Sequence, residues 1–96
     1  MSPTKLSESE IAEKLAACPE WTDVNDEITR TYQFDDFKAS MAFVTRVADY
    51  AEDVQHHPDI LIRYNKVTLT VSTHDAHGIT QKDFDLAQKA DELAES

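Results

Sequence analysis

Apolar residues recur three and four positions apart in three stretches of the chain, and two of these stretches open with a capping box. Ser7 and Glu10 have the S-x-x-E spacing in which each residue caps the backbone of the other, and they predict a helix over about 8–18. Thr80 and Asp83 repeat this arrangement before the last stretch. The apolar positions are Ile11, Leu15 and Ala16 in the first helix and Phe84, Ala87, Ala90, Leu93 and Ala94 in the last.

The middle stretch predicts a longer helix. Asp35 or Asp36 can cap its first turn, and it reaches about Val54 before Pro58 pushes the residue in front of it towards extended geometry. The predicted apolar face of this helix consists of Phe37, Met41, Val44, Ala48 and Ala51.

The segment between the first two helices predicts a pair of strands. From Glu27 to Phe34 the side chains alternate between apolar and polar, as they do in a half-buried strand. Trp21 opens a partner strand, which reaches the first one across a turn at Asn25-Asp26. The two strands therefore form a hairpin.

A second hairpin follows the long helix. Ile60 to Tyr64 and Val67 to Thr73 are rich in β-branched residues, and a turn at Asn65-Lys66 separates them. In the second of these strands, apolar residues alternate with threonines and a serine, so one face of the strand is apolar and the other polar. A loop at 75–79 then leads to the last helix.

The order α-β-β-α-β-β-α predicts an α+β fold, a four-stranded antiparallel sheet with three helices on one face. The other face carries Thr68, Thr70 and Ser72, and such a face meets solvent or is half covered by another subunit. The chain has 96 residues and shows no linker or repeat, so residues 1–96 are expected to form a single domain.

Composition limits the function classes. With 41% hydrophobic and 29% charged residues, the chain has the make-up of a soluble globular protein. No apolar run approaches the roughly 20 residues that cross a bilayer, and no signal peptide precedes the first helix, so we expect a cytoplasmic protein without a membrane partner. A formal net charge of −10 argues against direct binding of nucleic acid. The lone Cys18 leaves no disulfide framework.

The histidines are the candidates for chemistry. His56 and His57 lie at the end of the long helix, and His74 lies at the end of the last predicted strand. Asp83, in the first turn of the last helix, would be held near His74 by its capping role. The predicted topology therefore allows a polar pocket with three imidazoles and an acid at its rim.

Other interpretations of these residues stay open on spacing alone. Histidines are often surface or packing residues, and His56 at a helix end is favourable for the helix dipole whatever its function. With His77 the chain has enough nitrogen and oxygen donors for zinc, but adjacent histidines usually diverge and no H-E-x-x-H motif is present. A metal site is therefore not predicted. Neither a G-x-S-x-G elbow nor a glycine-rich phosphate loop occurs.

Four motifs carry a family resemblance when they are taken together. They are E-D-V-Q-H-H-P at Glu52 to Pro58, Y-N-K-V at Tyr64 to Val67, S-T-H at Ser72 to His74 and K-D-F-D-L-A at Lys82 to Ala87. With Trp21 and the run from Phe37 to Ala48, they resemble the pterin-4a-carbinolamine dehydratases over almost the whole chain.

The resemblance implies an enzyme that removes water from a 4a-hydroxytetrahydropterin such as 4a-hydroxytetrahydrobiopterin and leaves the quinonoid dihydropterin. Histidine acid–base catalysis in pterin recycling is the implied activity, with no metal or bound cofactor because the pterin is the substrate. The implied catalytic positions are His56, His57, His74 and Asp83. The implied substrate-binding positions are Gln55, Ser72, Thr73, Asp75, Glu52 and Trp21.

The resemblance also implies a homodimer or homotetramer, and some animal members of the family act as coactivators by binding a homeodomain transcription factor. Two departures affect the rim of the implied site. His77 stands where relatives often carry a small residue or cysteine, and Asp75 stands where several carry glutamate. A noncatalytic protein-interaction module on the same fold is the main alternative function.

Overall fold

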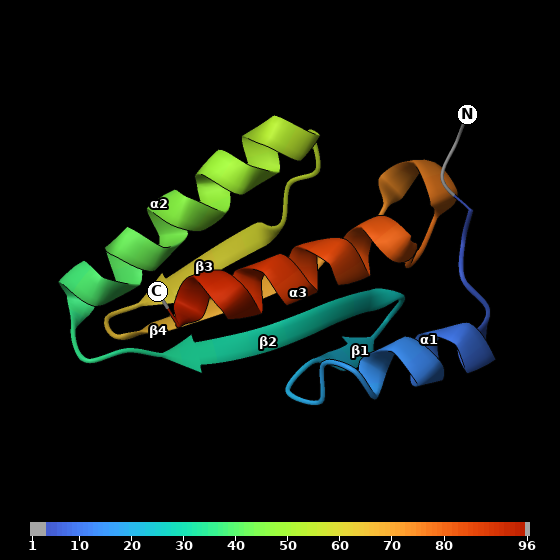
Figure 1. Cartoon of the computed structure of the whole chain (residues 1–96), viewed down its shortest axis with the longest axis horizontal. Helices are drawn as coiled ribbons and strands as arrows, with labels where there is room; N and C mark the ends of the chain where they lie inside the picture. The colour runs from blue at the N-terminus through green and yellow to red at the C-terminus, as the bar shows by residue number, and fades with distance from the viewer. Residues whose placement is uncertain (1–3, 96) are drawn as a thin grey trace.

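The computed structural model describes residues 4–95 and confirms the predicted order of elements (Figure 1). Three helices and four strands follow one another as α-β-β-α-β-β-α, with one short 3₁₀ helix before the last α-helix. The elements are α1 (Glu8–Leu15), β1 (Thr22–Val24), β2 (Glu27–Gln33), α2 (Phe37–Val54), β3 (Asp59–Arg63), β4 (Lys66–Val71), η1 (His74–Ala76) and α3 (Gln81–Ala94).

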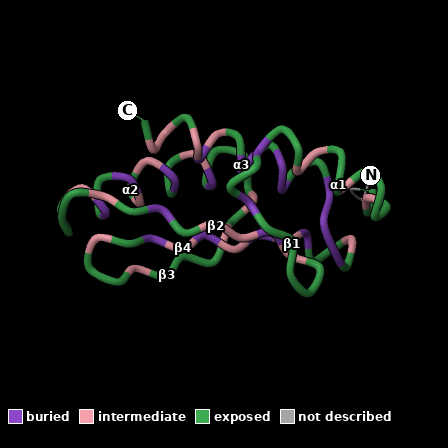
Figure 2. Tube along the Cα trace, turned by 90° about the horizontal axis from the view of Figure 1, so that it is seen from below, coloured by how far each residue is buried: buried purple, intermediate pink, exposed green. Residues whose placement is uncertain are grey.

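The four strands form one antiparallel sheet in the order β1-β2-β4-β3. Figure 2 shows the helices on one side of this sheet, so the predicted α+β class is confirmed. The pairing of β2 with β4 places the two hairpins side by side, because Ile28 lies opposite Val71 and Tyr32 opposite Val67. The end of β4 therefore lies in the middle of the sheet, between the first turn and the start of β3.

The core lies between the sheet and the helices. Val67, Leu69 and Val71 of β4 are buried, as the alternation predicted, and they share the core with Ile28 and Tyr32 of β2. From α3, the core receives Phe84, Leu86, Ala87 and Ala90. Burial of this apolar surface against α3 is the main force that holds the last helix on the sheet.

The opposite face of the sheet is polar, as predicted. Thr29 meets Thr70 with 3.0 Å between their hydroxyl oxygens, and Thr31 meets Thr68 at 2.7 Å. Such cross-strand threonine pairs stabilise neighbouring strands while leaving the face wettable. Leu61 interrupts the polar face and is 56% exposed.

The predicted apolar face of α2 is wrong in part. Phe37 and Met41 are exposed, and of the five predicted positions only Ala51 is buried. A neighbouring stripe with the same three- and four-residue spacing is buried instead, and it comprises Ser40, Phe43, Val47 and Ala51. The hydroxyl of Ser40 donates to the Asp36 carbonyl oxygen at 3.3 Å, which allows this polar residue to lie in the core. Helical period alone did not distinguish the two stripes, because both repeat correctly.

Several element boundaries differ from the prediction by one to three residues. The first α-helix ends at Leu15 rather than at 18, because the N–H of Ala17 and of Cys18 donate to carbonyls three residues back and tighten the last turn. In the second hairpin, Arg63 pairs with Lys66, so the turn is Tyr64-Asn65 and not Asn65-Lys66. The last strand ends at Val71 instead of Thr73.

Among residues 4–95, no helix combines the length and the apolar character needed to span a membrane.

Candidate active site

A pocket of about 340 Å³ opens where α2 ends, beside the end of β4 and the start of α3. Three imidazoles from two distant segments line it, and they belong to His56, His57 and His74. The other lining residues are Gln55, Ser72, Thr73, Asp75 and Lys82. The structure therefore brings the predicted histidines to one pocket.

The way in which α2 ends sets the directions of the His56 and His57 side chains. Gln55 adopts a left-handed conformation with φ of 53°, which ends the helix, and the N–H of His56 donates back to the Ala51 carbonyl at 3.1 Å. The amide of the Gln55 side chain donates to the Glu52 carbonyl oxygen at 2.7 Å. Because the chain turns sharply here, the two adjacent histidines point to different partners.

His57 is paired with Glu52, one turn back on α2. The imidazole Nε2 lies 2.6 Å from the carboxylate Oε2, and both side chains are largely exposed, at 55% and 71%. An ionised carboxylate only accepts hydrogen bonds, so Nε2 carries a proton, and in the neutral imidazole Nδ1 is then an acceptor. The pair is open to solvent, and it fixes the tautomer of His57 more than it stabilises the fold.

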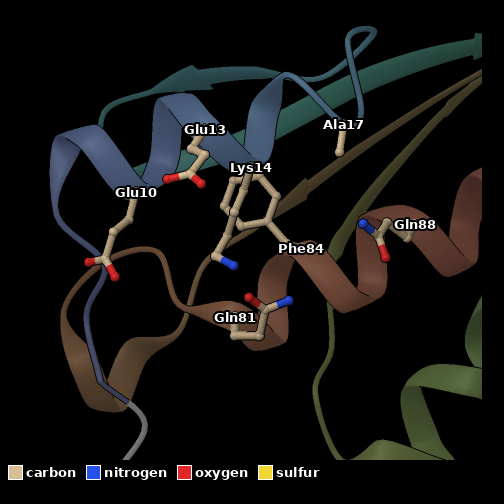
Figure 3. Close-up of a pocket in the computed structure, with 7 residues that line it drawn as sticks. All are labelled: Glu10, Glu13, Lys14, Ala17, Gln81, Phe84 and Gln88. Atoms are coloured by element: carbon tan, nitrogen blue, oxygen red, sulfur yellow. The ribbon is translucent and has the colours of Figure 1, made fainter.

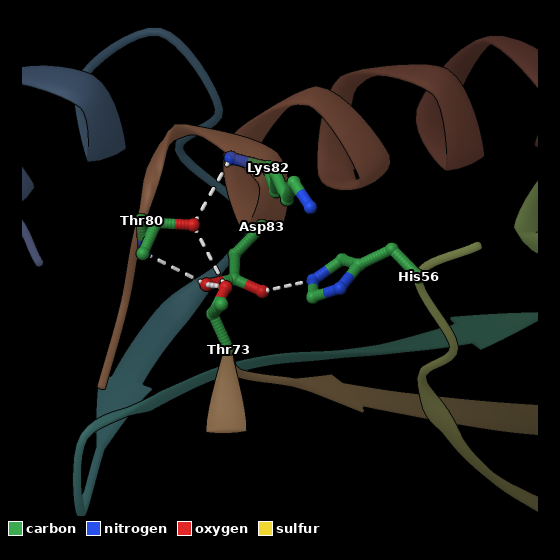
Figure 4. Close-up of polar contacts among 5 residues, drawn as sticks. All are labelled: His56, Thr73, Thr80, Lys82 and Asp83. Atoms are coloured by element: carbon green, nitrogen blue, oxygen red, sulfur yellow. Dashed lines mark hydrogen bonds and ion pairs between the residues drawn. The ribbon is translucent and has the colours of Figure 1, made fainter. Parts of the chain in front are cut away.

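His56 is held by a buried carboxylate. Its Nε2 lies 2.6 Å from Oδ1 of Asp83, whose side chain is fully buried. The other carboxylate oxygen, Oδ2, accepts from the hydroxyl of Thr73 at 2.9 Å and from the N–H of Thr80 at 2.8 Å (Figure 4). The predicted capping box of Thr80 and Asp83 is thus present, and the same carboxylate that caps α3 also orients an imidazole.

The hydrogen bonds of this cluster run in one direction. The N–H of Lys82 donates to the hydroxyl of Thr80 at 3.2 Å, and the hydroxyls of Thr80 and Thr73 lie 2.7 Å apart. Since the Thr73 proton is used on Asp83, the Thr80 hydroxyl must donate to Thr73. Every donor therefore leads to the carboxylate, and His56 completes the set by donating through Nε2. In the neutral imidazole, its Nδ1 is then an acceptor.

His74 differs from the other two imidazoles. It opens η1 immediately after the end of β4, in a loop closed by hydrogen bonds between Thr73 and Gly78. Its side chain is exposed and makes no hydrogen bond or ion pair with any residue of the described range 4–95. The His74 imidazole is therefore available to contact a molecule bound in the pocket.

Lys82 lines the pocket, although sequence reasoning gave it no role. Figure 4 shows its side chain extending from the first turn of α3 on the side of His56. Its ammonium has no partner within residues 4–95. A cation in the first turn of a helix opposes the helix dipole, and this unfavourable placement was the signal in the sequence that could have drawn attention to it.

Trp21 does not line the pocket. Its indole is 3% exposed, and Nε1 donates to Oδ1 of Asp91, two turns along α3 from Asp83. It packs edge-on against Tyr32 in the core. Of the other predicted substrate-binding residues, Gln55, Ser72, Thr73 and Asp75 line the pocket, and Glu52 reaches it through His57.

A larger hollow of about 480 Å³ lies between α1 and α3, and no imidazole lines it (Figure 3). The ring of Phe84 lies between the acidic residues of α1 and the glutamines of α3. Across residues 4–95, no three His, Cys, Asp or Glu side chains are grouped as a metal ion would require. Cys18 is buried, and burial raises the pKa of its thiol.

An α+β scaffold thus holds two imidazoles by carboxylates beside a third that has no partner in the described part of the chain, an arrangement that can exchange protons with a bound molecule. The chain belongs to the pterin-4a-carbinolamine dehydratase family, because the model described as "Pterin 4 alpha carbinolamine dehydratase" matches residues 4–93. The resemblance inferred from the motifs is therefore confirmed.

Individual relatives agree with this assignment. A protein of Chloroflexus aurantiacus, provisionally named a pterin-4-alpha-carbinolamine dehydratase, is 56% identical over 89 residues, which cover 93% of this chain and 96% of the relative. A protein of Nocardia farcinica with the same provisional name is 51% identical over 94 residues, or 98% and 99% of the two chains. A crystal structure from Brucella melitensis, described as a transcriptional coactivator/pterin dehydratase, superposes with a TM-score of 0.92 at 38% identity, covering 95% of this chain and 99% of that one.

Proposed function

We propose that the protein is a dehydratase that converts a 4a-hydroxytetrahydropterin to the quinonoid dihydropterin and water. The observation that carries this proposal is the convergence of His56, His57 and His74 on one pocket of about 340 Å³ in a chain of this family. Tetrahydrobiopterin as the parent pterin and a role in pterin recycling belong to the same proposal.

The reaction needs a proton donor and a proton acceptor. The bond between C4a and its hydroxyl oxygen breaks, and the oxygen takes a proton and leaves as water. The N–H on the neighbouring nitrogen, N5, loses its proton, and the double bond between C4a and N5 forms. Positioned proton transfer of this kind accelerates a reaction by roughly 10²- to 10⁴-fold. Imidazole suits both roles, because its ordinary pKa near 6.5 keeps both protonation states accessible near neutral pH.

The hydrogen bonds suggest how the roles are divided. His57 donates through Nε2 to Glu52, so its Nδ1 can accept the proton from N5. His74 has no partner within residues 4–95 and can carry the proton that the leaving hydroxide requires. His56, held by Asp83, forms a fixed wall with an acceptor at Nδ1. Glu52 and Asp83 then act as positioning residues, since each sets the tautomer of a histidine.

The flat pterin also needs groups that recognise its edge. Backbone groups of Ser72 to Asp75 and the side chain of Gln55 line the pocket and offer donors and acceptors for this edge. The proposed mechanism requires no metal and no bound cofactor, because general acid–base catalysis supplies every proton that moves.

A stopped-flow assay of dehydration tests the proposal. On a freshly generated 4a-hydroxytetrahydropterin, His57→Ala and His74→Ala are each expected to lower turnover by about one to three orders of magnitude. Gln88→Ala removes an exposed polar side chain of α3 outside the pocket and is the control. Circular dichroism checks that each variant is folded. Full activity in both histidine variants would contradict the assignment.

We also propose that the protein forms a homodimer or homotetramer. β3 is an edge strand with one side unpaired, and its Ile60 and Leu61 are 36% and 56% exposed. Exposed apolar edges of this kind are usually covered by another chain. Sedimentation equilibrium measures the mass in solution, and Leu61→Lys should lower it. A monomeric wild-type protein at micromolar concentration would contradict this proposal.

A second candidate function is protein interaction without catalysis. The Brucella structure is described as a transcriptional coactivator/pterin dehydratase. In this chain, Phe37 and Met41 of α2 are 49% and 37% exposed and could contact a partner protein. Recovery of one stoichiometric partner from the native cell extract, together with no dehydratase activity in the assay above, would favour this candidate. Dehydratase activity that depends on His57 and His74 would favour the enzyme.

A further inference from the structure

A second hollow of about 210 Å³ lies beside the histidine pocket. The two hollows share Ser72, Thr73 and His74, so the end of β4 forms the wall between them. Beyond this wall, the second hollow is lined by the first hairpin turn and by the loop before α3. These further residues are Asn25, Asp26, Glu27, His77 and Gly78.

Another hollow shares His56 and Lys82 with the pocket, but it is smaller and more apolar. It measures about 90 Å³ and is lined by Tyr50, Val54, His56, Lys82 and Asp85. A water molecule takes roughly 30 Å³ in the liquid, so the second hollow has room for several groups of that size, whereas this one has room for very few. A flexible polar chain attached to a bound ring therefore fits the second hollow better.

Four polar side chains that line the second hollow do not bond to other residues of the described fold. Asn25, Asp26, Glu27 and His77 make no side-chain hydrogen bond or ion pair with residues 4–95. Asn25 and Asp26 have left-handed φ values of 52° and 63°, as a two-residue hairpin turn requires, and His77 ends η1 with φ of 58°. The hollow is therefore lined by polar side chains that have no side-chain partner among residues 4–95.

Its position relative to the reaction follows from the chemistry of the pterin ring. C6 is bonded to N5, and N5 is bonded to C4a, so a substituent at C6 leaves the ring two bonds from the reacting carbon. His74, the imidazole assigned to the leaving hydroxide, lines both hollows. A ring bound with C4a beside His74 therefore has its C6 substituent close to the entrance of the second hollow.

We propose that the second hollow is the subsite for the C6 substituent of the substrate, and that it selects neutral, hydroxylated chains over anionic ones. This inference depends on the proposed dehydratase function. Asp26 and Glu27 accept hydrogen bonds from hydroxyl groups, and Asn25 and His77 can donate or accept. The same two carboxylates repel a substituent that carries a carboxylate or phosphate.

The test compares three 4a-hydroxytetrahydropterins that differ only at C6, where they carry a methyl group, a dihydroxypropyl chain or a carboxylate-bearing chain. The wild-type enzyme should prefer the dihydroxypropyl substrate to the carboxylate substrate. The double variant Asp26→Asn, Glu27→Gln should reduce this preference by about tenfold, chiefly through KM, because contacts remote from the reacting atoms bind substrate and transition state alike. Asparagine tolerates the left-handed conformation at position 26.

The matched control is the double variant Glu20→Gln, Asp23→Asn. It removes the same two charges from exposed positions of the same segment that line neither hollow, so it separates local recognition from long-range electrostatic repulsion. An unchanged preference in the Asp26 and Glu27 variant, or an equal change in the control, would overturn the subsite. The methyl substrate reports on the histidine pocket alone, and failure of the wild-type enzyme to dehydrate it would overturn the proposed function instead.

Discussion

Two carboxylates of α3 each collect three hydrogen bonds, yet they have different surroundings. Asp83, in the first turn, is fully buried and accepts on both oxygens, one facing His56 and the other facing Thr73 and the Thr80 N–H. Asp91, two turns later, is 28% exposed and accepts on Oδ1 alone. Its three donors are the indole of Trp21 at 3.0 Å, the guanidinium of Arg30 at 2.8 Å and the phenol of Tyr32 at 2.5 Å.

The difference shows that an aspartate with three hydrogen-bond donors can either stabilise the fold or orient a residue of the pocket. The donors around Asp91 all belong to the core or its rim, so this cluster ties the first hairpin and the segment before it to α3. The donors around Asp83 include one imidazole whose remaining nitrogen faces a pocket. A carboxylate that accepts from an imidazole also fixes the tautomer of that imidazole, whereas one that accepts from an indole, a guanidinium and a phenol fixes only their positions.

Replacement of each aspartate by asparagine should separate these roles most strongly. In Asp83→Asn the amide oxygen stays with the two donors on the Thr73 side, and the NH₂ group faces His56. His56 must then accept through Nε2 and carry its proton on Nδ1. We expect turnover to fall by about 10- to 1000-fold while the fold is retained.

The ¹⁵N chemical shifts of the His56 ring measure the tautomer directly. Asp91→Asn is the matched control, since its amide oxygen can keep all three donors while NH₂ replaces Oδ2. If Asp83→Asn kept both the tautomer and full turnover, the positioning role of Asp83 would be wrong.

Truncation of Asp91 tests the structural half of the comparison. In Asp91→Ala the buried indole and phenol of Trp21 and Tyr32 lose their acceptor, and a buried unpaired donor costs about 1–3 kcal/mol. Arg30 is 25% exposed on its side chain and can turn to water, so it adds little. We expect a loss of about 2–4 kcal/mol in the free energy of unfolding, measured with urea. The turnover number of the folded fraction should stay near that of the wild type. A large fall in turnover would contradict the assignment of a purely structural role to Asp91.

The smallest of the three expected effects is the change in the free energy of unfolding at alkaline pH. Burial and the Asp91 carboxylate raise the pKa of Tyr32 well above its ordinary value of 10.0. The unfolded chain therefore loses this proton first, and the stabilisation is complete below a pH of about 10 and is lost as the pH rises towards the folded pKa. The free energy of unfolding should fall between about pH 9.5 and 11.5.

Tyr32→Phe should reduce this slope. A residual slope is expected, because burial also raises the pKa of Tyr50 and of Cys18. Phe34→Leu, a neighbouring aromatic change without a titrating group, is the control for altered packing. An identical slope in wild type and Tyr32→Phe would show that the phenol does not report on the Asp91 cluster.

Much of the candidate site could be predicted because it depends on local signals. The capping box placed Asp83 at the start of α3, and Pro58 placed His56 and His57 at the end of α2. The sequence motifs brought Glu52, Gln55 and Ser72 to Asp75 into the same prediction. Lys82 was missed because its place in the first turn of a helix is a weak signal until its neighbours in space are known.

Residues whose placement depends on docking were predicted less well. Trp21 was expected near the pocket, but the structure puts its indole beside Asp91, because nothing local distinguishes the two ends of α3 as partners for a residue 70 positions away. The second hollow was not foreseen either, since it forms only where the Asn25-Asp26 turn meets the loop of His77.

The sequence by itself determined the order of the elements, the alternation of β4 and the caps of all three helices, because periodicity and capping act between residues a few positions apart. Only the tertiary structure decided which of two equivalent stripes of α2 is buried and which polar groups meet across the end of the sheet. Those choices depend on how whole elements pack against one another, and packing joins residues that no local pattern connects.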